Sequence, residues 1–197
     1  GGTFDPIHLG HTGIARAVQD FLGLSRVDFM PAGRPPHKRA IGASPSQRLE
    51  MVRLAAEGLP FARVSDMEIR REGVIYTLDT LRAYKALEPE AELHYIIGMD
   101  TLFQLPSWWR HEEIYPLCIF EVVGRLGQEK GAALEMAERL KGEYGARIQI
   151  LPLAGPELSS TELRALLRVR GDTSGLLDEK VRAYIEKEGL YLGEDAE

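Results

Sequence analysis

The chain of 197 residues is long enough to bury a full hydrophobic core as one domain, with or without a small appendage. Its 44% hydrophobic and 27% charged residues are typical of globular proteins, no apolar run approaches the length of a membrane span, and the one cysteine excludes an internal disulfide and fits a reducing cytoplasm. The net charge of −6 argues against general nucleic-acid binding and requires that a local group of cations draw any anionic substrate.

Helix-like and strand-like segments alternate after an N-terminal turn. Apolar spacing and capping signals predict the helices, and short β-branched runs predict the strands. The predicted helices are Ile14–Leu22, the segment from the Ser44 cap through Ala55, Thr77–Leu87, Lys130–Glu143, Thr161–Arg168 and Asp178–Glu188. The predicted strands are Val27–Met30, a region marked by Val64, Met67 and Ile69, Leu93–Ile97, Cys118–Val123 and Arg147–Leu151.

This alternation predicts parallel strands joined by helical crossovers, and hence an α/β fold with a doubly wound parallel sheet. Residues 1–197 are expected to form a single domain, in which residues 154–197 make a C-terminal helical part. Ligands of such sheets bind outside the carboxyl ends of the strands. Because the later motifs follow predicted strands, we expect the motifs to face one cleft.

The first eleven residues, Gly1-Gly2-Thr3-Phe4-Asp5-Pro6-Ile7-His8-Leu9-Gly10-His11, carry the most specific functional signal. Their glycines and proline predict a tight turn in which backbone amides can approach a ligand. The spacing of His8 and His11 places two side chains on one face of the first turn of a helix, where N–H groups and the helix dipole attract phosphate. Gly10 lets a large anion lie against the backbone. This pattern predicts a phosphate site.

The histidine pair has two other interpretations, a structural zinc site and a pair of surface residues without a role. A structural zinc site needs two further ligands with suitable spacing, and the remaining histidines are single: His37, His94 and His111. A pair of surface histidines without a role leaves the glycines of the turn unexplained. The phosphate site is therefore the favoured interpretation.

A basic loop, Arg34-Pro35-Pro36-His37-Lys38-Arg39, follows the strand predicted at Val27–Met30. Its prolines stiffen the loop and its cations can trap an anion. The alternative is an ordinary solvated basic loop. Lys38 is the candidate phosphate ligand here.

The block Ser159-Ser160-Thr161-Glu162-Leu163-Arg164 begins a late helix. Ser159 and Glu162 fit a capping box. Exposed amides and hydroxyls at this helix start, together with Arg164, predict a second phosphate cradle that faces the first. The alternative is an ordinary capped helix with a surface arginine.

Two further blocks suit a nucleotide ligand. Asp100, in Gly98-Met99-Asp100, follows a buried strand, where its carboxylate can accept hydrogen bonds from ribose hydroxyls; alternatively it caps the short helix that follows. In Pro106-Ser107-Trp108-Trp109-Arg110, adjacent tryptophans cannot both face one core, so one of them can stack on a flat ring. The alternative for either tryptophan is packing.

Taken in chain order, these blocks resemble the bacterial nicotinate-nucleotide adenylyltransferases of the nucleotidylyltransferase superfamily. The resemblance covers essentially the whole chain, and it includes Tyr76-Thr77-Leu78-Asp79-Thr80 and an ending through Gly189-Leu190-Tyr191. It implies a Rossmann-like fold and a cytoplasmic enzyme of NAD biosynthesis that joins ATP to nicotinate mononucleotide, releasing pyrophosphate. It also implies Mg²⁺ bound mainly through the ATP phosphates, with no protein metal ligand named. Asp5 is expected instead to hold the turn by bonding backbone amides.

The resemblance assigns roles to individual residues. The catalytic group is His8, His11, Lys38 and Arg164. The ATP-binding group is Gly1, Gly2, Thr3, Phe4, His8, Gly10, His11, Ser159, Ser160, Thr161 and Arg164. The acceptor-binding group is Lys38, Tyr76, Thr77, Gly98, Asp100, Trp108, Trp109 and Arg125. One departure is Leu126, which stands where the family usually has proline next to Arg125.

Other possibilities stay open at this point. Relatives carry a buried strand immediately upstream of the glycine turn, so we expect the sequence to be a piece of a longer protein. One alternative function is another nucleotidylyltransferase, acting on pantetheine phosphate or a phospho-alcohol. A second alternative is a nucleotide-sensing protein without activity, although such a protein is expected to lose a histidine of the pair or the late arginine. No nucleic-acid or membrane partner is expected, and the oligomeric state is open.

Overall fold

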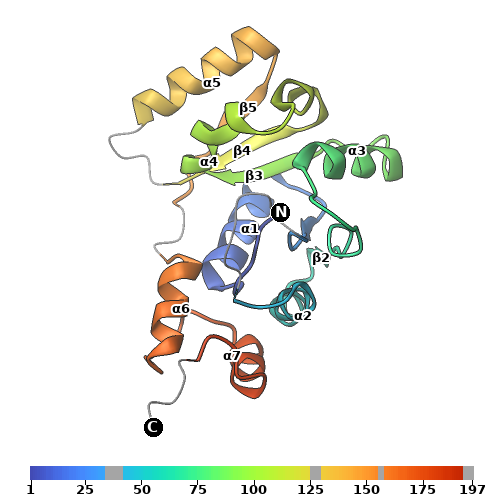
Figure 1. Cartoon of the computed structure of the whole chain (residues 1–197). Coiled ribbons are helices and arrows are strands. Elements are labelled where there is room, and N and C mark those ends of the chain that lie inside the picture. The colour runs from blue at the N-terminus through green and yellow to red at the C-terminus, as the bar shows by residue number, and fades with distance from the viewer. Residues whose placement is uncertain (34–41, 125–129, 155–157, 193–197) are drawn as a thin grey trace. The chain divides into compact units, whose positions relative to one another are not determined.

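The computed structural model describes residues 1–33, 42–124, 130–154 and 158–192. The chain divides into two compact units, one made of Gly1–Val74 with Pro156–Glu197 and the other of Ile75–Gly155. We call these unit 1 and unit 2. Figure 1 shows the helices and strands of both units in the colours of the chain order.

Unit 1 combines the two ends of the chain. Its helices and strands are α1 (Leu9–Leu22), β1 (Val27–Phe29), α2 (Pro45–Ala56), β2 (Ala62–Val64), α6 (Ser160–Arg168) and α7 (Glu179–Lys187). β1 and β2 pair in parallel, with Val27 opposite Ala62. Gly2 forms an isolated parallel bridge with Pro31, so the N-terminal turn lies beside the segment that follows β1.

The core of unit 1 is shared by distant parts of the sequence. Ile7, Val52, Leu163 and Ile185 are each almost fully buried, and they come from the N-terminal turn, α2, α6 and α7. Burying one such side chain contributes roughly 1.5–3 kcal/mol. The two C-terminal helices therefore pack as part of unit 1, next to the turn that carries the histidines.

Unit 2 is built on a parallel sheet. Its elements are α3 (Thr77–Leu87), β3 (His94–Gly98), α4 (Met99–Gln104), three 3-10 turns (Leu105–Ser107, His111–Glu113 and Tyr115–Leu117), β4 (Ile119–Val123), α5 (Lys130–Tyr144) and β5 (Arg147–Ile150). The strand order is β3-β4-β5. Phe120 and Val122 of β4 are fully buried in one core with Leu81 of α3 and Leu140 of α5. Helices thus cover this face of the sheet.

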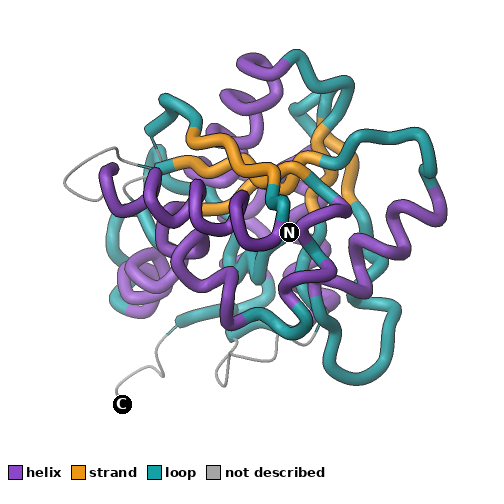
Figure 2. The backbone as a smooth tube through the Cα atoms, turned by 90° about the horizontal axis from the view of Figure 1, so that it is seen from above, coloured by secondary structure: helices purple, strands orange, loops and turns teal. Residues whose placement is uncertain are grey.

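Parallel strands alternating with helices confirm the α/β class predicted from the sequence, and Figure 2 shows the helices in purple and the strands in orange. The predicted caps explain several boundaries. Ser44 accepts a hydrogen bond from the Gln47 N–H at 3.3 Å, and the Gln47 side chain accepts one from the Ser44 N–H at 2.9 Å. Asp178 caps α7 by accepting from the Lys180 N–H at 2.9 Å.

Three predicted details differ from the structure. α1 begins at Leu9 rather than Ile14, because His8 already serves as its N-cap. Met67 and Ile69 lie in a turn and not in a strand, since the Arg70 N–H bonds to the Asp66 carbonyl at 3.0 Å. The third concerns α4.

The N-cap of α4 is Gly98, and Asp100 lies inside the first turn. The interpretation of Asp100 as the cap of this helix is therefore wrong. Its carboxylate near the N-terminus still favours the helix dipole. Across the described ranges, no helix combines the length and the apolar character that crossing a membrane requires.

Candidate functional site

The N-terminal turn is fixed by pairing with the chain after β1. The Gly2 N–H donates to the Met30 carbonyl at 3.1 Å, and the Ala32 N–H donates to the Gly2 carbonyl at 2.8 Å. Phe4 has a φ of +50°, which is uncommon for a residue with a side chain. Its ring is buried in the core of unit 1. The turn is therefore fixed by backbone hydrogen bonds at Gly2 and by the buried ring of Phe4.

Asp5 supports this turn through its carboxylate. Oδ2 accepts a hydrogen bond from the Gly42 N–H at 2.8 Å, and Oδ1 accepts one from the Ala43 N–H at 3.0 Å. The expectation that Asp5 bonds backbone amides is confirmed. Asp5 thereby ties the turn to the segment that begins α2.

The two histidines of the motif lie side by side. Their ring centroids are 3.7 Å apart with an interplanar angle of 38°. His8 is the N-cap of α1 and His11 is its third residue, so only His11 belongs to the first helical turn. His8 is 3% exposed, whereas His11 is half-buried and its ring meets the Phe4 ring edge-on at 5.1 Å. The spacing in the sequence therefore does bring two imidazoles together at a helix start.

The surroundings of the pair set its protonation. The His8 backbone N–H donates to Nδ1 of His11 at 3.2 Å, which leaves the proton of a neutral His11 ring on Nε2. Burial lowers the pKa of His8 from 6.5 to about 4, so this ring is uncharged near pH 7. Nδ1 of His8 is buried without a hydrogen-bond partner among the described residues. His8 can therefore donate a hydrogen bond to a phosphate as a neutral ring, and His11 can donate through Nε2.

The helix start itself offers fewer amides than the sequence suggests. The Leu9 N–H donates to the Leu176 carbonyl at 3.0 Å, and the His11 N–H donates to the His8 carbonyl at 2.9 Å. A chain segment before α7 thus takes one of the amides that we expected to face a phosphate. The histidine side chains remain the main donors at this end of α1.

The late serine block caps α6 as predicted. Ser159 Oγ accepts from the Glu162 N–H at 3.2 Å, and the Glu162 carboxylate accepts from the Ser159 N–H at 2.9 Å. The Ser159 hydroxyl also donates to the Glu162 carboxylate at 2.7 Å, and this bond, with the one from the Ser159 N–H, lowers the pKa of Glu162. Ser160, the first residue of α6, takes no part in these capping bonds, and its hydroxyl donates to the Pro6 carbonyl at 3.1 Å. The two predicted cradles therefore contact each other within unit 1.

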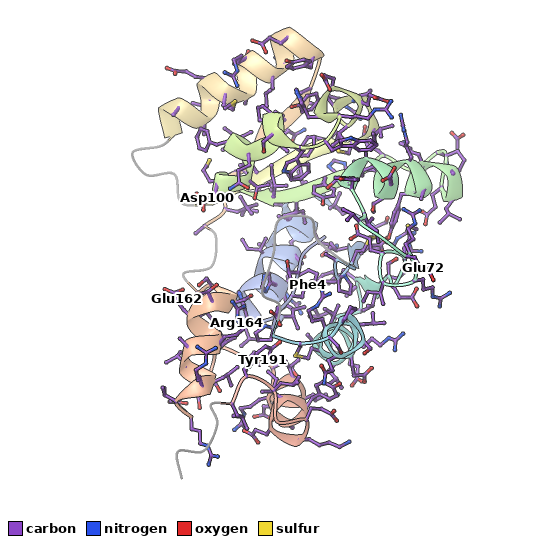
Figure 3. All side chains as sticks on the ribbon, viewed as in Figure 1. Phe4, Glu72, Asp100, Glu162, Arg164 and Tyr191 are labelled. Carbon is purple, nitrogen blue, oxygen red and sulfur yellow. The ribbon has the colours of Figure 1, made fainter. Side chains whose placement is uncertain are left out.

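Arg164 makes the second connection between the two cradles. Its Nη1 donates to the Asp5 carbonyl at 2.7 Å, and its Nη2 donates to Thr161 Oγ1 at 3.3 Å. The side chain is 25% exposed. A guanidinium carries five N–H donors in a rigid fork, so these two bonds orient the group without exhausting it. Figure 3 shows Arg164 on α6 with Phe4 of the turn labelled beside it.

The predicted acceptor residues of unit 2 include an aromatic group. Tyr76, the N-cap of α3, contacts Trp109 with ring centroids 4.6 Å apart, and the Arg110 guanidinium lies 5.3 Å from the Trp109 ring. Trp108 is partly buried and meets Tyr95 edge-on at 6.2 Å. The adjacent tryptophans thus have different environments, as their adjacency predicts. Trp108 packs toward the core of unit 2 and Trp109 is 44% exposed.

The remaining predicted residues fall into two groups. Thr77 begins α3, Gly98 ends β3, and Asp100 is exposed in α4. These three therefore lie at the ends of elements, where backbone and side-chain groups can reach a ligand. Lys38 and Arg125 lie outside the described residues.

Sequence reasoning missed Arg48, which is fully buried in α2. Its Nη1 donates to the Thr3 carbonyl at 2.7 Å and its Nη2 to the Gly33 carbonyl at 3.0 Å. A signal was available, because Arg48 stands on the same helical stripe as the buried Met51, Val52 and Ala55. A cation on an apolar stripe indicates a buried polar role.

Tyr191 was also missed as a site residue. Its hydroxyl donates to Asp5 Oδ1 at 2.6 Å, across nearly the full length of the chain. Burial and this hydrogen bond raise the pKa of Tyr191, so the hydroxyl keeps its proton. No local pattern in the sequence predicts such a contact.

The described residues contain no group of three histidine, cysteine, aspartate or glutamate side chains placed to hold a metal ion. Asp5, the acidic residue of the turn, already accepts hydrogen bonds at both carboxylate oxygens. The donor chemistry of this part of unit 1 is instead that of an anion site: imidazoles, a guanidinium and hydroxyls.

Comparison with known proteins gives consistent names. A family model described as cytidylyltransferase-like matches residues 1–166. A probable nicotinate-nucleotide adenylyltransferase of Dehalococcoides mccartyi is 42% identical over 97% of this chain and 94% of its own length. One of Gloeobacter violaceus, with the same name, is 42% identical over 97% of this chain and 93% of its length.

A solved structure shares the fold. Plasmodium falciparum nicotinic acid mononucleotide adenylyltransferase complexed with NaAD superposes with a TM-score of 0.77. The match covers 96% of this chain and 94% of that one, at 20% sequence identity. The α/β arrangement described above is therefore that of a nucleotidylyltransferase fold.

Proposed function

The chain belongs to the nicotinate-nucleotide adenylyltransferase family, within the cytidylyltransferase-like proteins, and from this premise we propose that it joins ATP to nicotinate mononucleotide. The products are nicotinate adenine dinucleotide and pyrophosphate, in the cytoplasmic biosynthesis of NAD. One observation carries the proposal most directly. Ser160 and Arg164, about 150 residues along the chain from the histidine pair, donate hydrogen bonds to the carbonyls of Pro6 and Asp5 in the turn that leads into the pair.

The proposed reaction is a direct displacement at phosphorus. A 5′-phosphate oxygen of nicotinate mononucleotide attacks the α-phosphorus of ATP, and the bond from that phosphorus to the β-phosphate bridging oxygen breaks. Pyrophosphate leaves with the electron pair. The attacking phosphate is already an anion, so the reaction needs no general base and no covalent enzyme intermediate. Catalysis then consists of positioning and of stabilising negative charge.

Each group of unit 1 has a role in this proposal. His8 and His11 donate hydrogen bonds to the α-phosphate as its charge rises, and neutral rings suffice because donation needs an N–H and not a cation. Arg164 binds the leaving phosphates with the donors that its two protein bonds do not use. Further contacts to ATP are assigned to Gly1, Gly2, Thr3, Phe4, Gly10, Ser159, Ser160 and Thr161.

The acceptor is assigned to residues of unit 2 and to the basic loop. Asp100 accepts hydrogen bonds from ribose hydroxyls, and Trp108 stacks on the pyridine ring. The other residues assigned to the acceptor are Tyr76, Thr77, Gly98, Trp109, Lys38 and Arg125. Residues 1–197 act in this proposal as one domain, in which residues 154–197 close over ATP.

Mg²⁺ enters the proposal as part of the substrate. Magnesium keeps several waters and binds phosphates in preference to all-protein cages, so it arrives with the ATP phosphates. Asp5 is assigned no part in holding it, because amides and a hydroxyl already bond that carboxylate.

A pyrophosphate-release assay with ATP and a panel of acceptors tests the proposal. We expect release with nicotinate mononucleotide and little with pantetheine phosphate or glycerol phosphate. Preferred turnover of either of the latter would assign the chain to another nucleotidylyltransferase activity. ATP binding without turnover of any acceptor would assign it a nucleotide-sensing role.

A further inference from the structure

The carboxylate of Asp5 is the centre of a buried polar cluster formed with Gly42, Ala43, Arg164 and Tyr191. Asp5 is 3% exposed. Gly42 and Ala43 lie just before α2, Arg164 is in α6, and Tyr191 follows α7. One carboxylate therefore joins three distant parts of unit 1. Figure 3 labels Arg164 and Tyr191, which lie near each other beside the turn.

Both oxygens of this carboxylate have donors. Oδ1 accepts from the Tyr191 hydroxyl at 2.6 Å and from the Ala43 N–H at 3.0 Å. Oδ2 accepts from the Gly42 N–H at 2.8 Å and lies 3.7 Å from Nη1 of Arg164. That last distance is an ion pair longer than a hydrogen bond, and one N–H of Nη1 donates to the Asp5 carbonyl at 2.7 Å. The neutral donors thus hold the carboxylate just short of direct contact with the cation.

Tyr191 is held in place at both ends. Its φ is +63°, in the left-handed region, and its ring lies against the backbone of Gly42. A Cβ at Gly42 would lie 2.7 Å from Cε1 of Tyr191, closer than carbon atoms pack. The left-handed backbone and the close contact with Gly42 hold the ring, with its hydroxyl on Asp5.

We propose that Tyr191 is a positioning residue for adenylyl transfer, because its hydroxyl holds the Asp5 carboxylate and thereby keeps the Arg164 guanidinium available to the phosphates of ATP. Without the hydroxyl, Oδ1 loses a donor and the carboxylate turns toward the nearest cation. Arg164 then bonds the carboxylate directly and loses its orientation toward ATP. The inference rests on the proposed function for the identity of the anion, and on unit 1 alone for the geometry.

Tyr191→Phe tests the proposal because it removes the hydroxyl and keeps the ring against Gly42. We expect the KM for ATP to rise about tenfold, the effect of one lost hydrogen bond to a charged group, with the KM for nicotinate mononucleotide unchanged. Tyr184→Phe is the matched control, since Tyr184 packs on the same core from α7 and does not contact Asp5. We expect both of its KM values to equal those of the parent protein. Equal rises for both substrates in Tyr191→Phe, or no rise, would overturn the proposal.

A double variant tests whether Tyr191 acts through Arg164. In an Arg164→Ala background, Tyr191→Phe should leave the KM for ATP where the single Arg164→Ala variant puts it, because the group being positioned is gone. Multiplicative effects of the two substitutions would show that Tyr191 acts elsewhere, and the proposal would be wrong.

Two further measurements separate this inference from the proposed function and from misfolding. The dissociation constant for ATP, measured by calorimetry without an acceptor, should rise about tenfold in Tyr191→Phe even if nicotinate mononucleotide is not the acceptor. Gly42→Ala should displace the Tyr191 ring and raise the same constant, and circular dichroism of each variant confirms that it is folded. Unchanged ATP binding in folded Gly42→Ala protein would contradict the proposal.

Discussion

His8 and His11 lie side by side in different surroundings, and the difference decides what each can do. The buried His8 ring stays neutral, while the backbone of His8 fixes the proton of a neutral His11 on Nε2. A neutral donor such as His8 is well suited to an α-phosphate whose charge grows during the reaction, because it stabilises the charge without binding the ground state as strongly as a cation would.

Replacing either histidine should therefore harm turnover more than folding. We expect His8→Ala and His11→Ala each to lower kcat by about a hundredfold or more, the typical effect of removing one preorganised donor. His111→Gln, in unit 2 and outside the proposed site, is the matched control and should keep kcat within a factor of about two. Near-normal turnover in either alanine variant would remove that histidine from the site.

The protonation of His8 also makes a prediction about stability and pH. Because its folded pKa of about 4 lies below the ordinary value of 6.5, unfolded chains bind the proton more readily, and the stability that His8 contributes above pH 6.5 is lost as the pH falls toward 4. The loss amounts to at most about 3 kcal/mol. Urea unfolding at several pH values should show a shallower fall over this window in His8→Asn than in the parent protein. Equal slopes in the two proteins would mean that folding does not lower the pKa of His8.

Acceptor choice is a residue-scale question as well. If the amide N–H groups near Trp109 face the pyridine substituent, a carboxylate accepts their hydrogen bonds, whereas a carboxamide brings its own donors against them. Each buried unpaired donor costs about 1–3 kcal/mol, so two mismatches give a preference of about a hundredfold for the acid. The ratio of kcat/KM for nicotinate and nicotinamide mononucleotide at saturating ATP measures this. A ratio near one would contradict the assignment and return Trp108 to a packing role.

At the scale of elements, α2 both packs unit 1 and supports the phosphate turn. Its buried stripe carries Arg48, whose guanidinium bonds the carbonyls of Thr3 and Gly33. Burial lowers the pKa of Arg48, and the nearby Asp5 carboxylate acts against that shift. The helix therefore links the N-terminal turn with the segment after β1 by a buried cation.

Removing this cation should cost substantial stability. Arg48→Met leaves two carbonyls unpaired in the core, and we expect the free energy of unfolding in urea to fall by about 2–5 kcal/mol. Arg53→Met, on an exposed position of the same helix, should change it by less than about 0.5 kcal/mol. Equal effects of the two substitutions would show that the Arg48 bonds contribute nothing beyond the helix itself.

Element boundaries were predictable where a local cap decides them. α2 begins at the predicted Ser44 cap and α6 at the predicted Ser159 cap. α3 spans the predicted Thr77–Leu87 without a side-chain cap. Met67 and Ile69 were misassigned because pairing decides where a strand ends: the Ser65 N–H makes the last bond to Phe29 and a turn follows. Apolar residues in a short segment do not show where strand pairing ends.

At the scale of the whole molecule, the sequence predicted an α/β fold with parallel strands and a pair of adjacent imidazoles at a helix start, because both follow from short sequence patterns. It could not predict that Asp5 meets Tyr191 and Arg164, since those contacts depend on how distant segments pack. These contacts matter because the protein carries a net charge of −6, which repels anionic substrates. An acidic protein needs a cation held at its anion site, and in unit 1 Asp5 holds Arg164 while Arg48 supports the turn that contains Asp5.

The adenylyl transfer itself can be followed with labelled ATP. The protein is incubated with nicotinate mononucleotide, Mg²⁺ and ATP labelled at the α-phosphorus, and all labelled species are separated. We expect label in nicotinate adenine dinucleotide, in a one-to-one ratio with released pyrophosphate, and no label on the protein when the acceptor is omitted. Label attached to the protein, or label that stays in ATP while the protein is folded and binds ATP, would contradict this expectation.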